Sequence, residues 1–330
     1  MAKSKPRAFI TYALFLGLGG LLFYLAFRHT EWATLINDFR SVRWPYLIFS
    51  ALMGYYAFVA RGFRWNMLLN SMNYNIRSKW SAVHGIALGY FSNLVIPRSG
   101  EVFRCTAMYR AEDIPVNKLL GTVILERLVD LMMLGLLFIL GFVTNWSNMV
   151  SMFSQGADSQ YEFPWIIVFT ALLFLLMAVI IIRRYQHNPL LLRIRNFLKG
   201  IKEGLRSFKQ LSKRQRWRFV FYTFQIWIMY FLMVYIVFFA LDSTSHLTLS
   251  DGVFLMVAGS LGMVIPTPGG IGSYHFLMMT GLAFLGVDKS DGMSFGTIVH
   301  TTQLVMTLLA GVLGFLYLAS VEKKRVNGKD

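Results

Sequence analysis

Long apolar runs are the feature that most constrains the fold of this 330-residue chain. A helix needs about 20 apolar residues to cross a hydrocarbon core about 30 Å thick. Hydrophobic residues make up 56% of the chain and charged residues only 15%, whereas about a quarter of a soluble domain is charged. The chain is therefore predicted to be an all-α polytopic membrane protein with six crossings, at residues 9–27, 45–64, 119–143, 164–183, 218–241 and 294–319.

The distribution of charge indicates how these crossings are oriented. The net charge is +16, and twelve Lys or Arg lie between Arg183 and Arg218 beside a single acid, Glu203. Basic loops between crossings face the cytoplasm and attract anionic lipid headgroups. We therefore expect a multi-pass protein of the plasma (inner) membrane, with the loop 183–218, the N-terminus and the tail 321–330 in the cytoplasm. No nucleic-acid motif accompanies the basic residues, so nucleic acid is not an expected partner.

Two further apolar segments are interrupted by proline and glycine. The segment 80–113 breaks at Pro97-Arg98-Ser99-Gly100, and the segment 252–287 breaks at Pro266-Thr267-Pro268-Gly269-Gly270. The charges of the flanking loops place both ends of each segment on one side of the membrane. We predict two re-entrant helical hairpins, the first opening to the cytoplasm and the second opening externally, and leave open whether the arms of the second cross fully.

The two breaks share the pattern Val-Ile-Pro-x-x-Gly, at residues 95–100 and 264–269. Each break follows two predicted crossings and precedes a third, and the two sets have opposite orientation. We therefore predict an inverted repeat of halves 1–144 and 164–320, joined by the external loop 145–163. Inverted repeats with broken helices are typical of secondary transporters.

Three acids fall within hydrophobic segments. Glu101 lies beside the first break, and Glu126 and Asp130 share one face of the third crossing, with Arg127 on another face. A charge at membrane depth costs at least about 2 to 3 kcal/mol, so such groups line a cavity or pair with one another. We expect the acids to face a cationic group or carry a proton. The alternative is that Glu126 and Asp130 hold neighbouring helices together through Arg61, Arg64, Arg98 or Arg104.

The basic residues suggest contacts to phosphate. Arg98 and Arg104 flank a break that the predicted topology places in the bilayer, where a guanidinium can offer paired donors to a phosphate. Arg61 and Arg64 lie at i and i+3 near the inner end of the second crossing. They are candidates for the same site, or for interfacial anchors.

The second break offers backbone groups instead of charges. Gly269, Gly270 and Gly272 permit close approach of an anion to unpaired N–H groups at the start of the following arm. The alternative is that these glycines only permit a tight turn and close helix packing. His275 is a candidate titrating group or, alternatively, a hydrogen-bonded spacer.

Four motifs resemble those of a known family. They are Arg61–Trp65, Asn93–Arg104, Glu126–Asp130 and Pro266–Gly272, and their order and spacing resemble the transmembrane, flippase-like unit of the lysylphosphatidylglycerol synthases. The resemblance implies a unit that moves a phospholipid across the bilayer, without the synthase domain, and it implies that Asn93 belongs to the site. Where the family often has a glutamate after the second Gly-Gly turn, this chain has Ser273-Tyr274-His275, so the resemblance does not extend to the charge preference of the external half-site or to the same lipid substrate.

The sequence thus predicts a lipid flippase, or a transporter of a lipid-linked intermediate, whose polar cleft lies at the hairpin tips. The substrate-binding residues are predicted to be Arg61, Arg64, Asn93, Arg98, Glu101, Arg104, Glu126, Arg127, Asp130, Gly269, Gly270, Gly272 and His275. No catalytic motif appears, and one cysteine, Cys105, supports neither a disulfide nor a thiolate metal site, so no cofactor or metal is expected. The alternative function is a membrane subunit or intramembrane transferase that assists a separate enzyme in modifying phospholipids or polyprenyl-linked glycans.

Overall fold

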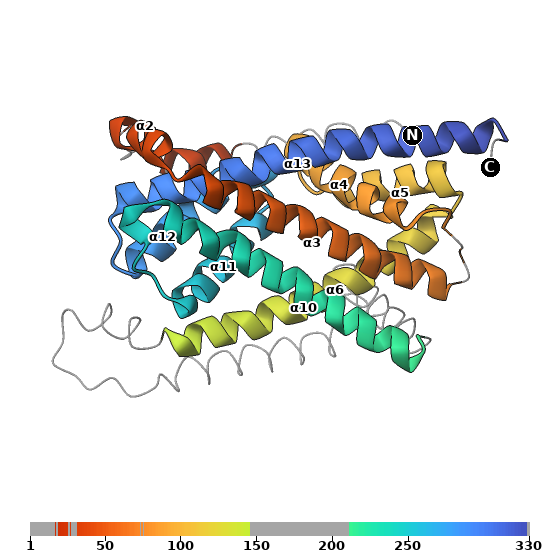
Figure 1. The fold of residues 1–330 in the computed structure, drawn as a ribbon, viewed down its shortest axis with the longest axis horizontal. Helices are drawn as coiled ribbons and strands as arrows, with labels where there is room; N and C mark the ends of the chain where they lie inside the picture. The colour runs from red at the N-terminus through yellow and green to blue at the C-terminus, as the bar shows by residue number, and fades with distance from the viewer. Residues whose placement is uncertain are drawn as a thin grey trace, which may run out of the picture.

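The computed structural model describes residues 32–72, 76–145 and 211–328, together with residues 17, 19–25, 27 and 74. Every regular element in this part of the chain is helical (Figure 1). The predicted external loop from residue 146 on, the crossing 164–183 and most of the basic loop 183–218 lie outside the described residues, as does part of the crossing 9–27.

Long helices form the body of the structure. They are α3 (Trp44–Ser71), α6 (Val116–Thr144), α10 (Lys213–Tyr235), which continues into the 3-10 helix η1 (Ile236–Ala240), and α13 (Lys289–Val326). Three of these, α3, α10 with η1, and α13, are long and apolar enough to cross a membrane, whereas α6 is equally long but carries three charged residues near its middle. These helices confirm the predicted runs at 45–64, 119–143, 218–241 and 294–319, and the count of six crossings stays a prediction.

The outer faces of these helices are apolar. Large hydrophobic side chains point away from the neighbouring helices along α6 and α13, among them Leu131, Leu136, Ile139, Leu308, Leu313 and Leu316. Such a continuous apolar surface would aggregate in water, whereas it suits the hydrocarbon of a bilayer.

The start of α10 and the presence of a short helix before α3 differ from the predictions. Helix α10 begins at Lys213, inside the predicted basic loop, because Ser212 and Gln215 form a reciprocal capping box that starts the helix there. A short helix, α2 (Trp32–Ser41), precedes α3 and was not predicted, since ten residues are too few to cross a membrane.

Both interrupted segments fold into helical hairpins. The first consists of α4 (Lys79–Val95) and α5 (Gly100–Glu112), and its two ends meet because the Glu112 carboxylate accepts hydrogen bonds from Ser81 and from the Arg77 amide, the latter at 3.0 Å. The second consists of α11 (Leu249–Val264), the 3-10 helix η3 (Pro268–Gly270) and α12 (Ser273–Phe284).

Each hairpin packs on a long helix from the other half of the chain. Helix α4 lies along α13, α11 lies on α6, and α3 packs along α10 between them (Figure 1). This reciprocal packing is what an inverted repeat predicts. The repeat itself and the position of the hairpins in the membrane stay predictions.

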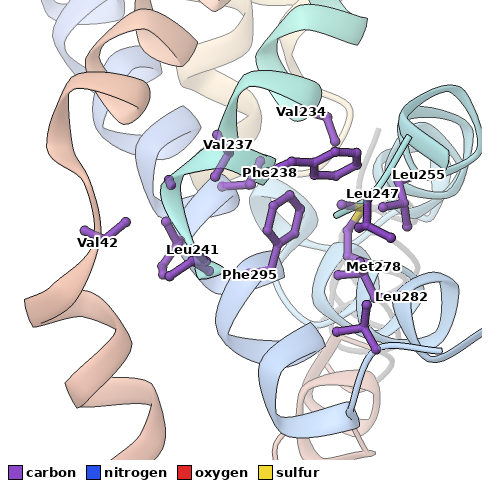
Figure 2. Packing of buried hydrophobic residues seen from close by; sticks show 14 of the residues in the cluster. Val42, Val234, Val237, Phe238, Leu241, Leu247, Leu255, Met278, Leu282 and Phe295 are labelled. Carbon is purple, nitrogen blue, oxygen red and sulfur yellow. The ribbon is translucent and has the colours of Figure 1, made fainter. Parts of the chain in front are cut away.

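An apolar core holds the second hairpin against the body of the protein. Phe238 of η1, Leu255 of α11, Met278 and Leu282 of α12, and Phe295 of α13 are all buried in it (Figure 2). The Phe238 and Phe295 rings lie 5.5 Å apart between centroids. The base of the hairpin is therefore anchored by packing, whereas its tip makes polar contacts.

The hairpin geometry leads to a labelling prediction. In a protein whose single cysteine, Cys105, is replaced by alanine, Ser78→Cys and Asn117→Cys should both react with an impermeant thiol reagent only from the cytoplasm, because they flank the two adjoining ends of the first hairpin. Asp158→Cys, outside the described residues, should react from the opposite side. Labelling of positions 78 and 117 from opposite faces would contradict a re-entrant hairpin.

A close contact between α3 and α4 leads to a stability prediction. A Cβ atom at Gly62 would lie 2.5 Å from the Val83 Cα, so Gly62→Ala must push the two backbones apart. We expect a loss of about 1 to 3 kcal/mol, the usual effect of overpacking, measured as a lower melting temperature in detergent. Gly121→Ala in α6 is the matched control because a Cβ there meets nothing within 4 Å. An equal effect of both variants would contradict the contact.

Candidate functional site

A cluster of charged side chains joins α3, α6 and α10. Asp130 lies near the middle of α6 and accepts hydrogen bonds from Arg61 and from Arg64 Nη2, the latter at 2.8 Å. The same arginines reach α10, where Arg61 donates to the Tyr230 hydroxyl at 3.0 Å and Arg64 to Thr223 Oγ1 at 3.1 Å. Both arginines are buried between helices, so they are not exposed interfacial anchors.

A second ion pair connects the first hairpin to α6. Arg104 Nη2 of α5 lies 2.6 Å from Glu126 Oε2, and both side chains are buried. The Arg104 guanidinium lies over the Trp65 ring, 4.6 Å from its centroid, and the Trp65 indole N–H donates to Thr122 Oγ1 at 2.8 Å. Arg104 Nε and Glu126 Oε1 have no hydrogen-bond partner among the described residues. The pair is therefore held in place, and one nitrogen of Arg104 and one oxygen of Glu126 can still form a hydrogen bond.

A third pair lies closer to the surface. Arg127 Nη2 is 2.7 Å from Glu101 Oε1, with side-chain exposures of 47% and 28%. Glu101 occupies the first turn of α5, where a carboxylate also interacts favourably with the helix dipole. All three acids thus contact arginines. The partners of Asp130 and Glu126 are Arg61, Arg64 and Arg104, which are among those that the helix-pairing alternative names.

A small pocket of about 10 Å³, room for about one water molecule, lies where these pairs meet the first hairpin. Asn93 contributes an amide: its Oδ1 accepts from the Gly100 N–H at 2.7 Å, which leaves its NH₂ group as a donor. The Tyr90 hydroxyl lies 3.2 Å from that of Tyr230. The pocket is lined by Arg61, Tyr90, Asn93, Glu101, Arg104 and Arg127, with Ile86, Gly89 and Gly100.

The structure therefore brings eight of the predicted site residues into one region. Arg61, Asn93, Glu101, Arg104 and Arg127 line the pocket. Glu126 and Asp130 are the partners of Arg104 and Arg61, and Arg64 is a second partner of Asp130. Tyr90 and Tyr230 were not predicted, because a tyrosine in an apolar run carries no signal that separates a pocket residue from a lipid-facing one.

Arg98 lies outside this pocket, at the tip of the first hairpin. It is exposed, with a left-handed backbone (φ 59°), and its Nη2 donates to the Val264 carbonyl at the end of α11, 3.1 Å away. A positive charge at a helix C-terminus is favourable. Arg98 thus joins the two hairpin tips.

The second break meets the first hairpin at Gly269. Gly269, Gly270 and Gly272 all have left-handed backbones. A Cβ atom at Gly269 would lie 3.2 Å from a methyl carbon of Leu94 in α4. The Gly270 N–H donates to the Thr267 carbonyl at 3.2 Å and the Gly272 N–H to His275 Nδ1 at 3.3 Å. These two N–H groups are therefore used inside the break.

His275 also lies in the second break, away from the pocket. Its ring packs against that of His300 at 4.7 Å, and His300 Nε2 donates to the Gly269 carbonyl at 2.9 Å. His275 therefore contacts the turn in the manner of the hydrogen-bonded spacer. Among the described residues, no three His, Cys, Asp or Glu side chains are placed to hold a metal ion.

Comparison with known proteins identifies the family. Residues 10–311 match the family model of the lysylphosphatidylglycerol synthase TM region. One UPF0104 membrane protein of Methanocaldococcus jannaschii is 24% identical over 228 residues, covering 68% of this chain and 93% of the relative. A second from the same organism is 21% identical over 307 residues, covering 84% of this chain and 85% of the relative. No solved structure matches.

The family match agrees with the resemblance predicted from the four motifs, which is thereby confirmed. Together with the apolar helices it shows that the protein is embedded in a membrane. Because the match covers most of the chain, the protein belongs to the lysylphosphatidylglycerol synthase TM region family.

Proposed function

We propose that the protein is a lipid transporter that moves a phospholipid or lipid-linked intermediate between the leaflets of the plasma membrane. The phosphate of the headgroup binds at the pocket beside the hairpin tips, which must widen to admit it, and both chain termini lie in the cytoplasm. The observation that carries the proposal is the charged pocket beside the middle of a long helix, lined by Arg61, Glu101, Arg104 and Arg127.

The energetic cost of this cluster supports a ligand-binding role. Each charge at the centre of a bilayer costs about 2.5 to 3.5 kcal/mol on insertion scales. A buried ion pair is often no more stabilising than apolar side chains of similar volume, so helix packing alone gives little reason to bury Asp130 with two arginines and Glu126 with Arg104. A pocket that receives a polar headgroup does give a reason.

The arrangement of the hairpins supports movement of that headgroup. Their tips meet through a few contacts, the Arg98 hydrogen bond to Val264 and the approach of Gly269 to Leu94, whereas their bases are packed into apolar cores. Separation of the tips would therefore free the tip of the first hairpin, which carries Asn93, Gly100 and Glu101 of the pocket lining, to move without unpacking the bases. The acyl chains stay in the hydrocarbon along the apolar outer faces of the helices.

Transport by the purified protein tests the proposal. The proteoliposomes contain a fluorescent phospholipid that an added quencher reaches only in the outer leaflet. The fluorescent lipid should move between the leaflets faster than in protein-free vesicles, and the fluorescence that the quencher removes measures this movement. The Asp242→Asn protein serves as control, since this acid is exposed and lies far from the pocket in a pair with Arg43. Wild-type protein that is folded but no faster than empty vesicles would contradict the proposal, and copurification with a lipid-modifying enzyme would then favour a membrane subunit.

A further inference from the structure

The charged residues around the pocket do not balance. Four arginines belong to the cluster, Arg61, Arg64, Arg104 and Arg127, against the three acids Glu101, Glu126 and Asp130. Asp130 is shared by two arginines. The cluster therefore carries one uncompensated positive charge, in a place where water cannot easily solvate it.

Each of the three acids already has an arginine partner. Asp130 accepts from Arg61 and Arg64, and Glu101 is paired with Arg127. Glu126 has one free oxygen, but its side chain is fully buried behind Arg104 and does not line the pocket. A ligand ammonium group would thus meet arginines without an unpaired carboxylate.

The groups left over in the pocket are donors. Arg104 Nε has no partner although the side chain is only 4% exposed. The Asn93 side-chain oxygen accepts a hydrogen bond from the Gly100 N–H, which leaves the Asn93 NH₂ group as a donor. Arg127 lies half-exposed at the rim of the pocket. A phosphate oxygen accepts hydrogen bonds and carries negative charge, so it satisfies both the donors and the charge.

Building on the proposed function, we infer that the pocket binds a lipid headgroup whose phosphate carries a net negative charge and no cationic substituent. A phosphodiester with an uncharged alcohol brings the single negative charge that the cluster lacks. A headgroup bearing an amine or an aminoacyl group brings positive charge toward Arg61, Arg104 and Arg127, which repel it.

The test compares headgroups at equilibrium. Purified full-length protein in phosphatidylcholine nanodiscs is titrated with short-chain phosphatidylglycerol, phosphatidylcholine and lysyl-phosphatidylglycerol, and each is scored by displacement of a fluorescent phosphatidylglycerol. We expect phosphatidylglycerol to bind at least about tenfold tighter than either competitor, because one unmatched charge is enough to cause a difference of this size in affinity. Equal or tighter binding of lysyl-phosphatidylglycerol would overturn the inference. Displacement by inorganic phosphate at the same concentration would overturn the assignment to a lipid.

Variants of the pocket rim provide a second test, because they should change the headgroup preference in opposite directions. Glu101→Gln adds one net positive charge to the pocket and should strengthen the preference for phosphatidylglycerol, whereas Arg127→Gln should weaken it about tenfold. Arg43→Gln and Asp242→Asn, far from the pocket, are the matched controls and should leave the preference unchanged. Opposite or absent shifts in the rim variants would overturn the inference.

The binding and transport results together test the inference and the proposed function separately. Transport in proteoliposomes without a headgroup preference would overturn the inference and leave the proposed function standing. A clear preference for phosphatidylglycerol without transport would support the inference and overturn the proposed function.

Discussion

Asp130→Asn should cause one of the largest losses of stability that a single substitution can produce in this protein. The change leaves Arg61 and Arg64 buried without their shared carboxylate. Removing one partner of a buried ion pair typically costs about 3 to 5 kcal/mol, because a charge remains in a low-dielectric environment. Thermal unfolding in a mild detergent, followed by intrinsic fluorescence, measures the effect.

The control for this prediction removes an acid from an exposed ion pair. Asp242 Oδ1 lies 2.6 Å from Arg43 Nη2, with side-chain exposures of 89% and 53%. An exposed pair contributes about 0 to 1 kcal/mol, so Asp242→Asn should shift the unfolding midpoint little. Similar midpoints for the Asp130→Asn and Asp242→Asn proteins would show that Asp130 is not buried between the two arginines.

The Arg104–Glu126 pair should behave as a coupled unit in a double-mutant cycle. Arg104→Met leaves the Glu126 carboxylate buried alone, and Glu126→Leu leaves the guanidinium alone, so each single variant should lose about 3 to 5 kcal/mol. The double variant Arg104→Met, Glu126→Leu should recover most of that loss, because no charge is left unpaired and the methionine can still pack on the Trp65 ring. Additive losses in the double variant would contradict a direct pair.

Local patterns in the sequence were sufficient to predict the helices and hairpins. The long apolar runs predicted α3, α6, α10 and α13, and Pro97 and Pro266 marked the two breaks. These features depend on hydrophobic periodicity and on backbone restrictions that act over a few residues. Helix α2 escaped prediction because it is too short to cross a membrane.

The pairing of charges depends on tertiary packing and could not be read from the sequence. Glu126 and Asp130 were predicted to share a helix face, yet Asp130 meets Arg61 across 69 residues of sequence and Glu126 meets Arg104 on a different helix. No spacing rule relates residues on separate helices. The second break shows a further limit, because the glycines suggested free N–H groups, whereas those of Gly270 and Gly272 have acceptors within the turn.

Lipid translocation by the Arg104→Met, Glu126→Leu double variant tests the central claim most directly, because it separates helix packing from headgroup binding. We expect an unfolding midpoint close to that of the wild type and a translocation rate lower by at least about tenfold, since the loss of one charge-assisted contact to phosphate is worth about 1.5 to 3 kcal/mol. A stable double variant that moves lipid at the wild-type rate would contradict the central claim, and the charged cluster would then serve only to hold α5 and α6 together.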